Sequence, residues 1–322
     1  MSLIDTYGRK INYLRLSVTD RCNLRCSYCM PSGPSCSNGR AALNDGDILR
    51  IARAAIASGV EKIRVTGGEP LVRPGIVALL AEMKGLPGLK NIVLTTNGIF
   101  LHEKASQLRA AGVESLNISI DSLRSETFRR ITRGGYLGKV LEGIESAEAA
   151  GFPHIKLNVV VMRGINDDEI EDFAALTLDK PYKVRFIEHM PLSPTGDSRA
   201  LTVPGREVLE RIARRFSMKK MTRKELDGPA EYYRLNGAIG EVGVITPISC
   251  HFCGHCNRLR VTSDGVLKSC LFDDGVISLC PFLELGDDAG LREAFRCAAR
   301  VKPFQHSLLE TRPSFTMAQI GG

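Results

Sequence analysis

The sequence LRLSVTDRCNLRCSYC, residues 14–29, is the stretch on which the organisation of this chain depends. Its first part belongs to a predicted strand over residues 13–18, in which apolar and polar side chains alternate. A loop follows at once, with cysteines at Cys22, Cys26 and Cys29. Three thiolates this close together can surround one metal centre. The stretch therefore predicts a strand that carries a metal-binding loop at its carboxyl end.

The same unit of a strand followed by a helix recurs through the first two thirds of the chain. Helical patterns lie between the strands, such as the one that Asn44 caps and that runs to Ala57. Predicted strands cover residues 13–18, 62–66, 91–95, 115–120, 155–161 and 183–187. Six such units imply right-handed crossovers and a parallel α/β sheet. The pattern alone leaves open a doubly wound sheet and a full or partial barrel.

Polar or glycine-rich segments follow the predicted strands, and in either arrangement they meet at one rim. They are the cysteine loop, Gly67-Gly68-Glu69-Pro70, Thr95-Thr96-Asn97-Gly98, Ser119 with Asp121, and Met190. Active sites of parallel α/β proteins form at the carboxyl ends of the strands. We therefore expect one shared site there.

The strand–helix pattern changes after about residue 196. Residues 203–216 read as a basic amphipathic helix, and residues 231–245 as short strands with a turn at Asn236-Gly237. A second group of cysteines follows. We expect a core of residues 1–230, including a connecting segment, and a smaller C-terminal module of residues 231–322.

The composition limits the classes of protein to which this chain can belong. The chain has 322 residues, 25% of them charged and 43% hydrophobic, with a net charge of +7. This balance is globular, and no apolar run is long enough for a membrane helix. The first ten residues hold no secretory signal, so we expect a soluble cytoplasmic protein. The positive charge suits an anionic partner, while the lack of Trp disfavours stacking on nucleic-acid bases.

Ten cysteines, of which three fall in residues 22–29 and five in residues 250–280, indicate metal sites rather than a disulfide scaffold. In the first group no fourth Cys or His lies near the C-x3-C-x2-C spacing. That set suits an iron–sulfur cluster with one iron left open, whereas structural zinc uses four ligands. Zinc with a distant ligand and a chance grouping of cysteines remain the alternatives.

An aromatic residue before the last cysteine, Tyr28, and the glycine-rich turn after the next strand make the chain resemble the radical S-adenosylmethionine (SAM) superfamily. The resemblance implies a [4Fe-4S] cluster on Cys22, Cys26 and Cys29, whose open iron binds SAM. It also implies that an electron from this cluster cleaves SAM to a 5′-deoxyadenosyl radical. The implied fold is a partial (β/α)6 TIM-like barrel with a small C-terminal module that carries a second iron–sulfur cluster.

The second group contains Cys253, Cys256 and Cys270, with Arg258-Leu259-Arg260 between them. A zinc ribbon completed by His251 or His255 is the alternative. Here the chain is similar to the GTP 3′,8-cyclase (MoaA) family of molybdenum cofactor biosynthesis. The similarity is carried by residues 14–22, 63–70, 94–98, 117–121, 185–190 and 253–270, and by the terminal Gly321-Gly322.

This similarity implies a second [4Fe-4S] cluster on Cys253, Cys256 and Cys270, whose open iron binds the guanine of GTP. Cys250 or Cys280 could act as a fourth ligand and close that iron. The positions that match SAM contacts are Tyr28, Gly68, Ser119 and Met190. The positions that match GTP contacts are Arg15, Arg64, Thr95, Lys156, Arg258, Leu259 and Arg260, of which Leu259 could contribute only its backbone.

The implied enzyme is a lyase in which the radical removes the 3′ hydrogen of the ribose, and the resulting carbon radical attacks C8 of the guanine. The product is (8S)-3′,8-cyclo-7,8-dihydroguanosine 5′-triphosphate, the first intermediate of molybdopterin synthesis. SAM and the clusters carry this chemistry, so no side chain is expected to be catalytic. The glycine tail is expected to reach into the site.

Expected partners are an electron donor of the flavodoxin or ferredoxin type, a second copy of the chain, and the cyclic pyranopterin monophosphate synthase that takes the product. Neither a membrane nor a nucleic acid is expected as a partner. Another two-cluster radical SAM enzyme, such as a peptide maturase, is the nearest alternative function. A non-enzymatic metal-containing sensor that binds nucleic acid is the alternative from a different class.

Overall fold

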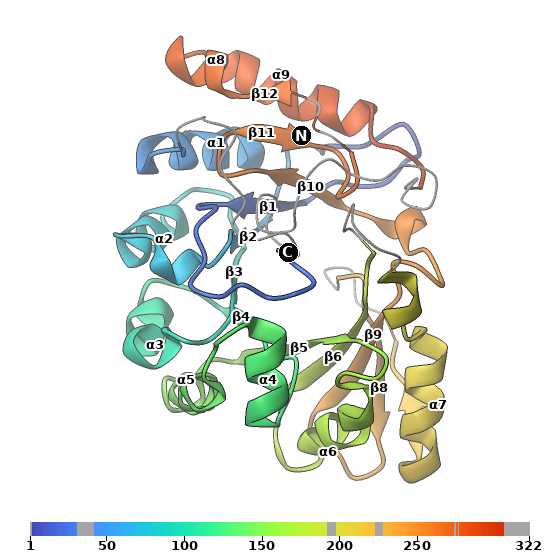
Figure 1. The fold of residues 1–322 in the computed structure, drawn as a ribbon. Helices are drawn as coiled ribbons and strands as arrows, with labels where there is room; N and C mark the ends of the chain where they lie inside the picture. Colours follow the sequence, from blue (N-terminus) through green and yellow to red (C-terminus); the bar gives the residue numbers. More distant parts are fainter. Residues whose placement is uncertain are drawn as a thin grey trace.

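Six parallel strands lie side by side in chain order, as the sequence pattern predicts (Figure 1). They are β1 (Tyr13–Ser17), β2 (Lys62–Thr66), β3 (Asn91–Thr96), β4 (Ser115–Ser119), β5 (His154–Val161) and β6 (Lys183–Glu188). The computed structural model describes residues 2–30, 42–191, 198–222, 228–273, 275 and 277–305. Parallel neighbours require crossover connections, and a helix supplies each of them.

The helices cover the outer face of the sheet (Figure 1). They are α1 (Asp45–Ala57), α2 (Ile76–Lys84), α3 (Leu101–Ala110), α4 (Ser125–Thr132), α5 (Leu137–Ala149), α6 (Ile170–Asp179), α7 (Gly205–Arg215), α8 (Cys280–Glu284) and α9 (Asp288–Arg300). The predicted start of α1 is confirmed, because Asn44 and Asp47 form a reciprocal capping box. Helix α4 was not predicted. In the described ranges, no helix is long and apolar enough to cross a bilayer.

The C-terminal part of the chain extends this sheet at both edges. Its strands are β7 (Met218–Lys220), β8 (Glu231–Leu235), β9 (Glu241–Ile245), β10 (Arg258–Val261), β11 (Val266–Lys268) and β12 (Ile277–Ser278). Strand β9 pairs parallel with β6, and β10 pairs parallel with β1. The remaining strands add antiparallel outside them, in the order β12-β11-β10-β1-β2-β3-β4-β5-β6-β9-β8-β7.

The expected fold class is thereby confirmed: a partial barrel of six β/α units with a C-terminal module. The module adds its strands to both edges of the core sheet, which sequence patterns did not indicate. The boundary at residue 230 stays a prediction.

The two faces of the sheet differ in chemistry. Outward side chains such as Leu14, Ile63 and Leu94 are fully buried in the apolar core beneath the helices. The residues between them point to the inside of the barrel, and there β1 and β2 present Arg15 and Arg64. Because successive side chains of a strand point to opposite faces, one strand can serve both an apolar core and a polar interior.

Gly67 and Gly68 fix the cysteine loop against the end of β2. The amide of Gly68 donates to the carbonyl of Thr19 at 2.7 Å, and the amide of Glu69 donates to the carbonyl of Arg21 at 2.8 Å. A Cβ atom on Gly68 would collide with the backbone of Arg21. The glycines are therefore required by contact between two backbones.

We predict that Gly68→Ala lowers the stability of the protein by about 1–3 kcal/mol, the usual effect of overpacking. Thermal unfolding followed by circular dichroism should show a midpoint lower by about 2 °C or more. Gly228→Ala is the control, because a Cβ atom there meets nothing within 4 Å. Equal midpoints for both variants would contradict the packing argument.

Candidate functional site

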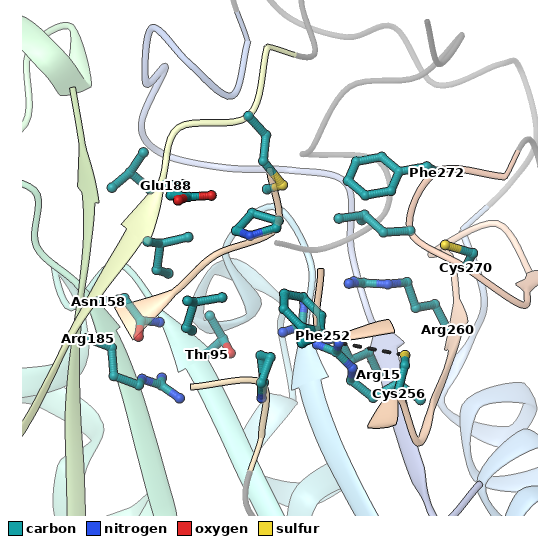
Figure 2. A pocket seen from close by; sticks show the side chains of 18 of the residues that line it. Arg15, Thr95, Asn158, Arg185, Glu188, Phe252, Cys256, Arg260, Cys270 and Phe272 are labelled. Atoms are coloured by element: carbon teal, nitrogen blue, oxygen red, sulfur yellow. Dashed lines mark hydrogen bonds between the residues drawn. The ribbon is translucent and has the colours of Figure 1, made fainter. Parts of the chain in front are cut away.

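The inside of the barrel holds a cavity of about 190 Å³ at the carboxyl ends of the strands (Figure 2). Residues from both halves of the chain line it. Among them are eleven of the residues that the sequence predicted for the site: Arg15, Tyr28, Arg64, Thr95, Ser119, Met190, Cys253, Cys256, Arg258, Arg260 and Cys270. Segments far apart in the sequence thus meet at one rim, as expected.

Three arginines stand in one row across neighbouring strands. Arg15 on β1 is in register with Arg260 on β10 and with Arg64 on β2. All three line the cavity, and Figure 2 shows Arg15 and Arg260 close to Cys256. Like charges in register on adjacent strands repel one another. The row is therefore a cost to the fold unless an anion binds beside it.

Arg15 and Arg64 have no carboxylate partner in the part of the chain that the structure describes. Among the described residues none forms an ion pair with Arg15 or Arg64, and the Nε atoms of both are buried without a hydrogen-bond partner. Burial and the charges of Arg260 and Arg64 hold the pKa of Arg15 well below its usual value. Buried cations without counter-charges are costly. These side chains are suited to bind a polyanion inside the barrel.

Arg185 on β6 extends the positive charge to the opposite wall of the cavity, and Lys156 lies on the neighbouring strand β5. Burial, the charge of Arg185 and other nearby cations lower the pKa of Lys156 to about 6. Lys156 is not among the residues that line the cavity, although it lies on β5 two residues before Asn158, which does. Arg185 lines the cavity and donates to Asn117 at 2.5 Å.

Arg185 lines the cavity, although it was not among the predicted site residues. It could have been predicted, because it is a basic residue on the inward face of a predicted strand, like Arg15 and Arg64.

The second cysteine set lies against the arginine row. Arg258 Nη2 is 3.7 Å from Cys256 Sγ, the contact dashed in Figure 2. Burial raises the pKa of Cys256, but the charges of Arg258 and Lys302 outweigh it and lower the pKa to about 6. A thiol that ionises this readily is suited to bind a metal. Cys250 is exposed at the surface.

Cys280 makes a different contact, since its Sγ approaches the carbonyl of Asp264 at 3.4 Å. Neither Cys250 nor Cys280 is among the residues that line the cavity.

Two buried side chains hold the segments that carry this set. Lys302 donates to the carbonyls of Arg258 and Ser269, at 2.9 and 2.6 Å, and so joins the two stretches next to Cys256 and Cys270. Glu188, at the end of β6, accepts from the amides of residues 205, 248 and 249. Neither residue was predicted, because single charged residues give no local signal of such long-range contacts.

The first cysteine set lies on the loop after β1. Tyr28 donates to Asp121 at 2.8 Å, which ties the loop to the end of β4 and brings Tyr28 into the cavity wall. Burial raises the pKa of Asp121 to about 6. Burial also raises the pKa of the Cys26 thiol, and the nearby charges of Asp121, Cys29 and Cys22 add to the effect. The three thiols of this loop are thus close enough to influence one another.

This donor set fits an iron–sulfur cluster. Within the described ranges, no three His, Cys, Asp or Glu side chains surround a point that one metal ion could occupy. In a four-iron cluster each thiolate binds its own iron, so its ligands need not converge on one point. Three thiols with Tyr28 and Asp121 behind them are consistent with that arrangement.

Glu69 stabilises the first cysteine loop through Asn97. Its side chain is 1% exposed and accepts from Thr96 Oγ1 at 2.8 Å and from the amide of Asn97 at 2.6 Å. Asn97 in turn donates to Asn23 in the loop at 2.8 Å. The motif that contains Glu69 was noticed in the sequence, but Glu69 itself was given no role.

The structure leaves several predicted residues outside the cavity wall. Leu259 is fully buried in the apolar core on the other face of β10, opposite the arginines. Five other predicted residues do not line the cavity either: Gly68, Lys156 and the three cysteines of the first loop. Cys36, Gly321 and Gly322 lie outside the described residues.

The barrel, the three-cysteine loop after β1 and the cavity at the strand ends define a radical SAM protein, and comparison with known proteins agrees. The profile of the radical SAM superfamily matches residues 16–177. A crystal structure of Streptococcus suis SuiB bound to S-adenosylmethionine has a similar fold, with a TM-score of 0.61. The match covers 90% of this chain and 69% of that one at 15% identity, so it supports the fold alone.

The C-terminal half of the chain shows to which family of radical SAM proteins it belongs. The profile described as Molybdenum Cofactor Synthesis C matches residues 182–308. The chain is 55% identical over 331 residues to the GTP 3′,8-cyclase of Geobacter sulfurreducens, with the whole of both chains covered. It is 49% identical to that of Peptoclostridium acidaminophilum, with 95% of this chain and 94% of that one covered. This chain belongs to the GTP 3′,8-cyclase family.

Tyr13 offers a test of the positive field in the barrel. Burial raises its pKa, but the charges of Arg64, Arg15, Lys62 and Arg258 outweigh burial and lower the pKa to about 8. We predict that ultraviolet difference absorbance shows a phenolate with this midpoint, and that it disappears in Tyr13→Phe. Inorganic tripolyphosphate should raise the midpoint towards the ordinary value near 10, because it neutralises the arginine row.

The same shift predicts a dependence of stability on pH. Since folding lowers the pKa of Tyr13, ionisation stabilises the wild-type protein relative to Tyr13→Phe as the pH rises from 8 to 10. A wild-type titration without the midpoint near 8 would show that the arginines do not act on this phenol.

Proposed function

We propose that this chain is a radical SAM enzyme that converts GTP to (8S)-3′,8-cyclo-7,8-dihydroguanosine 5′-triphosphate. The observation that carries the proposal is the row of Arg260, Arg15 and Arg64 inside the barrel beside Cys256 and Cys270. A nucleoside triphosphate supplies the negative charge that Arg15 and Arg64 lack among the described residues. Membership of the GTP 3′,8-cyclase family supports this choice of nucleotide.

The triphosphate is proposed to bind across the arginines. Guanidinium groups hold phosphate oxygens through paired hydrogen bonds, and Arg258 and Arg260 present theirs from one face of β10. Arg185 adds positive charge from the opposite wall, which suits a ligand that spans the cavity. Lys156, whose pKa is lowered to about 6, can take up a proton when an anion binds nearby. Binding the phosphates far from the ribose lets their binding energy fix the orientation of the reacting carbon.

Two [4Fe-4S] clusters and SAM are the cofactors that family membership implies. Cys22, Cys26 and Cys29 would hold the first cluster, and Cys253, Cys256 and Cys270 the second. When bound, these groups supply the electron and the organic radical that start the reaction. Cys250 is not assigned as a ligand, because it is exposed, whereas the six assigned cysteines are partly buried. Cys280 is not assigned either, because its thiol contacts the carbonyl of Asp264.

The remaining side chains bind and orient. Tyr28, Ser119 and Met190 lie on the part of the cavity wall next to the first loop, and with Gly68 they are the proposed SAM contacts. Thr95 Oγ1 and Asn158 Oδ1 are buried without hydrogen-bond partners, so both can bond to a polar ligand in the cavity. Leu259 contributes only its backbone. No side chain of this chain is proposed as catalytic.

We further propose that residues 1–230 form the SAM-binding unit and that residues 231–322 form the unit for the second cluster. A cytoplasmic location, a homodimer, a protein electron donor and transfer of the product to a cyclic pyranopterin monophosphate synthase are proposed with the function. These rest on the similarity of the sequence to its family.

Anaerobic reconstitution with iron and sulfide, followed by SAM, dithionite and GTP, tests the activity. We expect 5′-deoxyadenosine to form with GTP, together with the cyclised nucleotide detected by mass spectrometry. Cys250→Ala should take up as much iron as the wild type, whereas Cys256→Ala should lose the iron of the second cluster. A fully loaded protein that forms no deoxyadenosine with GTP would refute the function, and loss of iron in Cys250→Ala would refute the ligand assignment.

The arginine row predicts a second result. Arg258→Ala should weaken GTP binding about tenfold to a hundredfold, because a hydrogen bond to a charged group contributes about 1.5–3 kcal/mol. Equilibrium binding of radiolabelled GTP measures the change. Leu259→Val is the matched control on the same strand, since its side chain faces the apolar core. Equal affinities for both variants would exclude Arg258 as a GTP contact.

A further inference from the structure

A positively charged surface lies outside the barrel, next to the first cysteine loop. It consists of the exposed side chains of Arg25, Arg129, Arg130 and Arg133, and we call it the α4 basic surface. We propose that this surface docks an acidic protein that delivers single electrons to the first cluster. The inference rests on the proposed function, which requires reduction of that cluster.

The end of α4 is bonded directly to the cysteine loop. The amide of Arg25 donates to the carbonyl of Thr132 at 3.2 Å, and the amide of Ser27 donates to that of Ile131 at 2.9 Å. Figure 1 shows the blue loop after β1 passing beside α4. A partner seated on this end of α4 is therefore separated from the three thiols by little more than the loop itself.

The backbone of Arg133 directs its side chain back onto the loop. Among the described residues Arg133 is the one non-glycine residue with positive φ, at 54°, a conformation that is unfavourable for a residue with a side chain. Its Nη1 donates to the carbonyl of Met30, the residue after Cys29, at 3.0 Å. This arrangement places a cation at the last cysteine of the set.

Three of the four arginines of the α4 basic surface have no ion-pair partner among the described residues. Neither Arg25, Arg129 nor Arg130 forms an ion pair with a described residue, and Arg130 donates only to the carbonyl of Ile165 at 3.4 Å. A shallow hollow on this surface is lined by Glu126, Arg129, Arg130, Arg133 and Gly134. Glu126 is the single acid in that lining.

Helix α7 gives the contrast. There Arg206 pairs with Glu210 at 2.7 Å and Arg211 with Glu207 at 2.6 Å, so two of its four arginines are compensated on the helix itself. Arg215 pairs with Asp172 of α6 at 3.8 Å. The arginines of α4 are left for an external anion.

The position and the charge of the α4 basic surface indicate what kind of molecule binds to it. The surface is exposed and lies beside the loop, so a small phosphate ligand bound there would not reach the cavity. Tyr136, which is 65% exposed just beyond the end of α4, adds the aromatic contact that protein interfaces favour. An acidic carrier is attracted to such a surface at long range, and this attraction speeds encounter. In each transfer the carrier loses one electron and the first cluster gains it.

The test compares a protein reductant with a chemical one. Arg129→Glu/Arg130→Glu should lower kcat/KM for an enzymatically reduced flavodoxin by about tenfold or more, because charge complementarity raises association rates by about 10–10³. Activity with dithionite should stay at the wild-type level, since this small reductant needs no docking surface. Arg214→Glu/Arg215→Glu on α7 is the matched control, with the same change in charge on exposed residues of another helix.

The possible outcomes distinguish a failure of the docking proposal from a failure of the proposed function. An unchanged flavodoxin reaction in the α4 variant, or an equal loss in the α7 control, overturns the docking proposal. An equal loss with dithionite also overturns it, because the change would then act on the enzyme itself. A wild-type protein that is inactive with both reductants refutes the proposed function instead. Added salt should remove the difference between the wild type and the α4 variant.

Discussion

Mutual repulsion between arginines in register is the constraint around which this molecule is built. Arg260, Arg15 and Arg64 stand side by side on three strands, buried and without carboxylate partners among the described residues for Arg15 and Arg64. A sheet can contain such a row only if packing on its other face stabilises the fold enough to offset the repulsion between the arginines. Leu14 and Leu259, the outward neighbours of these arginines, are fully buried in the apolar core. The interior is thereby left free for a highly charged ligand.

Buried carboxylates at the strand ends hold the two cysteine-bearing regions in place. Glu69 receives hydrogen bonds from the ends of β2 and β3 beneath the first loop, and Glu188 receives them from the segment before the second set. Each binds mainly backbone amides, so it fixes the course of the chain rather than a side chain. This rigidity suits radical chemistry, in which a hydrogen atom must be removed from one carbon and not from its neighbours.

The sequence predicted the elements that depend on local patterns. Strand periodicity placed Arg15 and Arg64 on predicted strands, family resemblance marked Arg258 and Arg260, and the capping residue Asn44 marked the start of α1. It did not predict contacts that depend on the assembled sheet. Lys302 reaches Arg258 and Ser269 across long stretches of chain, and nothing near Lys302 indicates this. Likewise, the glycine pair at Gly67 and Gly68 indicated a tight turn, but its partner, the backbone of residues 19–21, became evident only in three dimensions.

The pairing of β9 with β6 and of β10 with β1 has a consequence for how the chain folds during synthesis. When the first six strands have left the ribosome, both edges of their sheet still present unpaired backbone groups, which can join strands of other molecules. The segments that cover the two edges are among the last to emerge. The nascent barrel is thus exposed to aggregation for a period that ends only when β9, before the second cysteine set, and β10, between Cys256 and Cys270, have been translated.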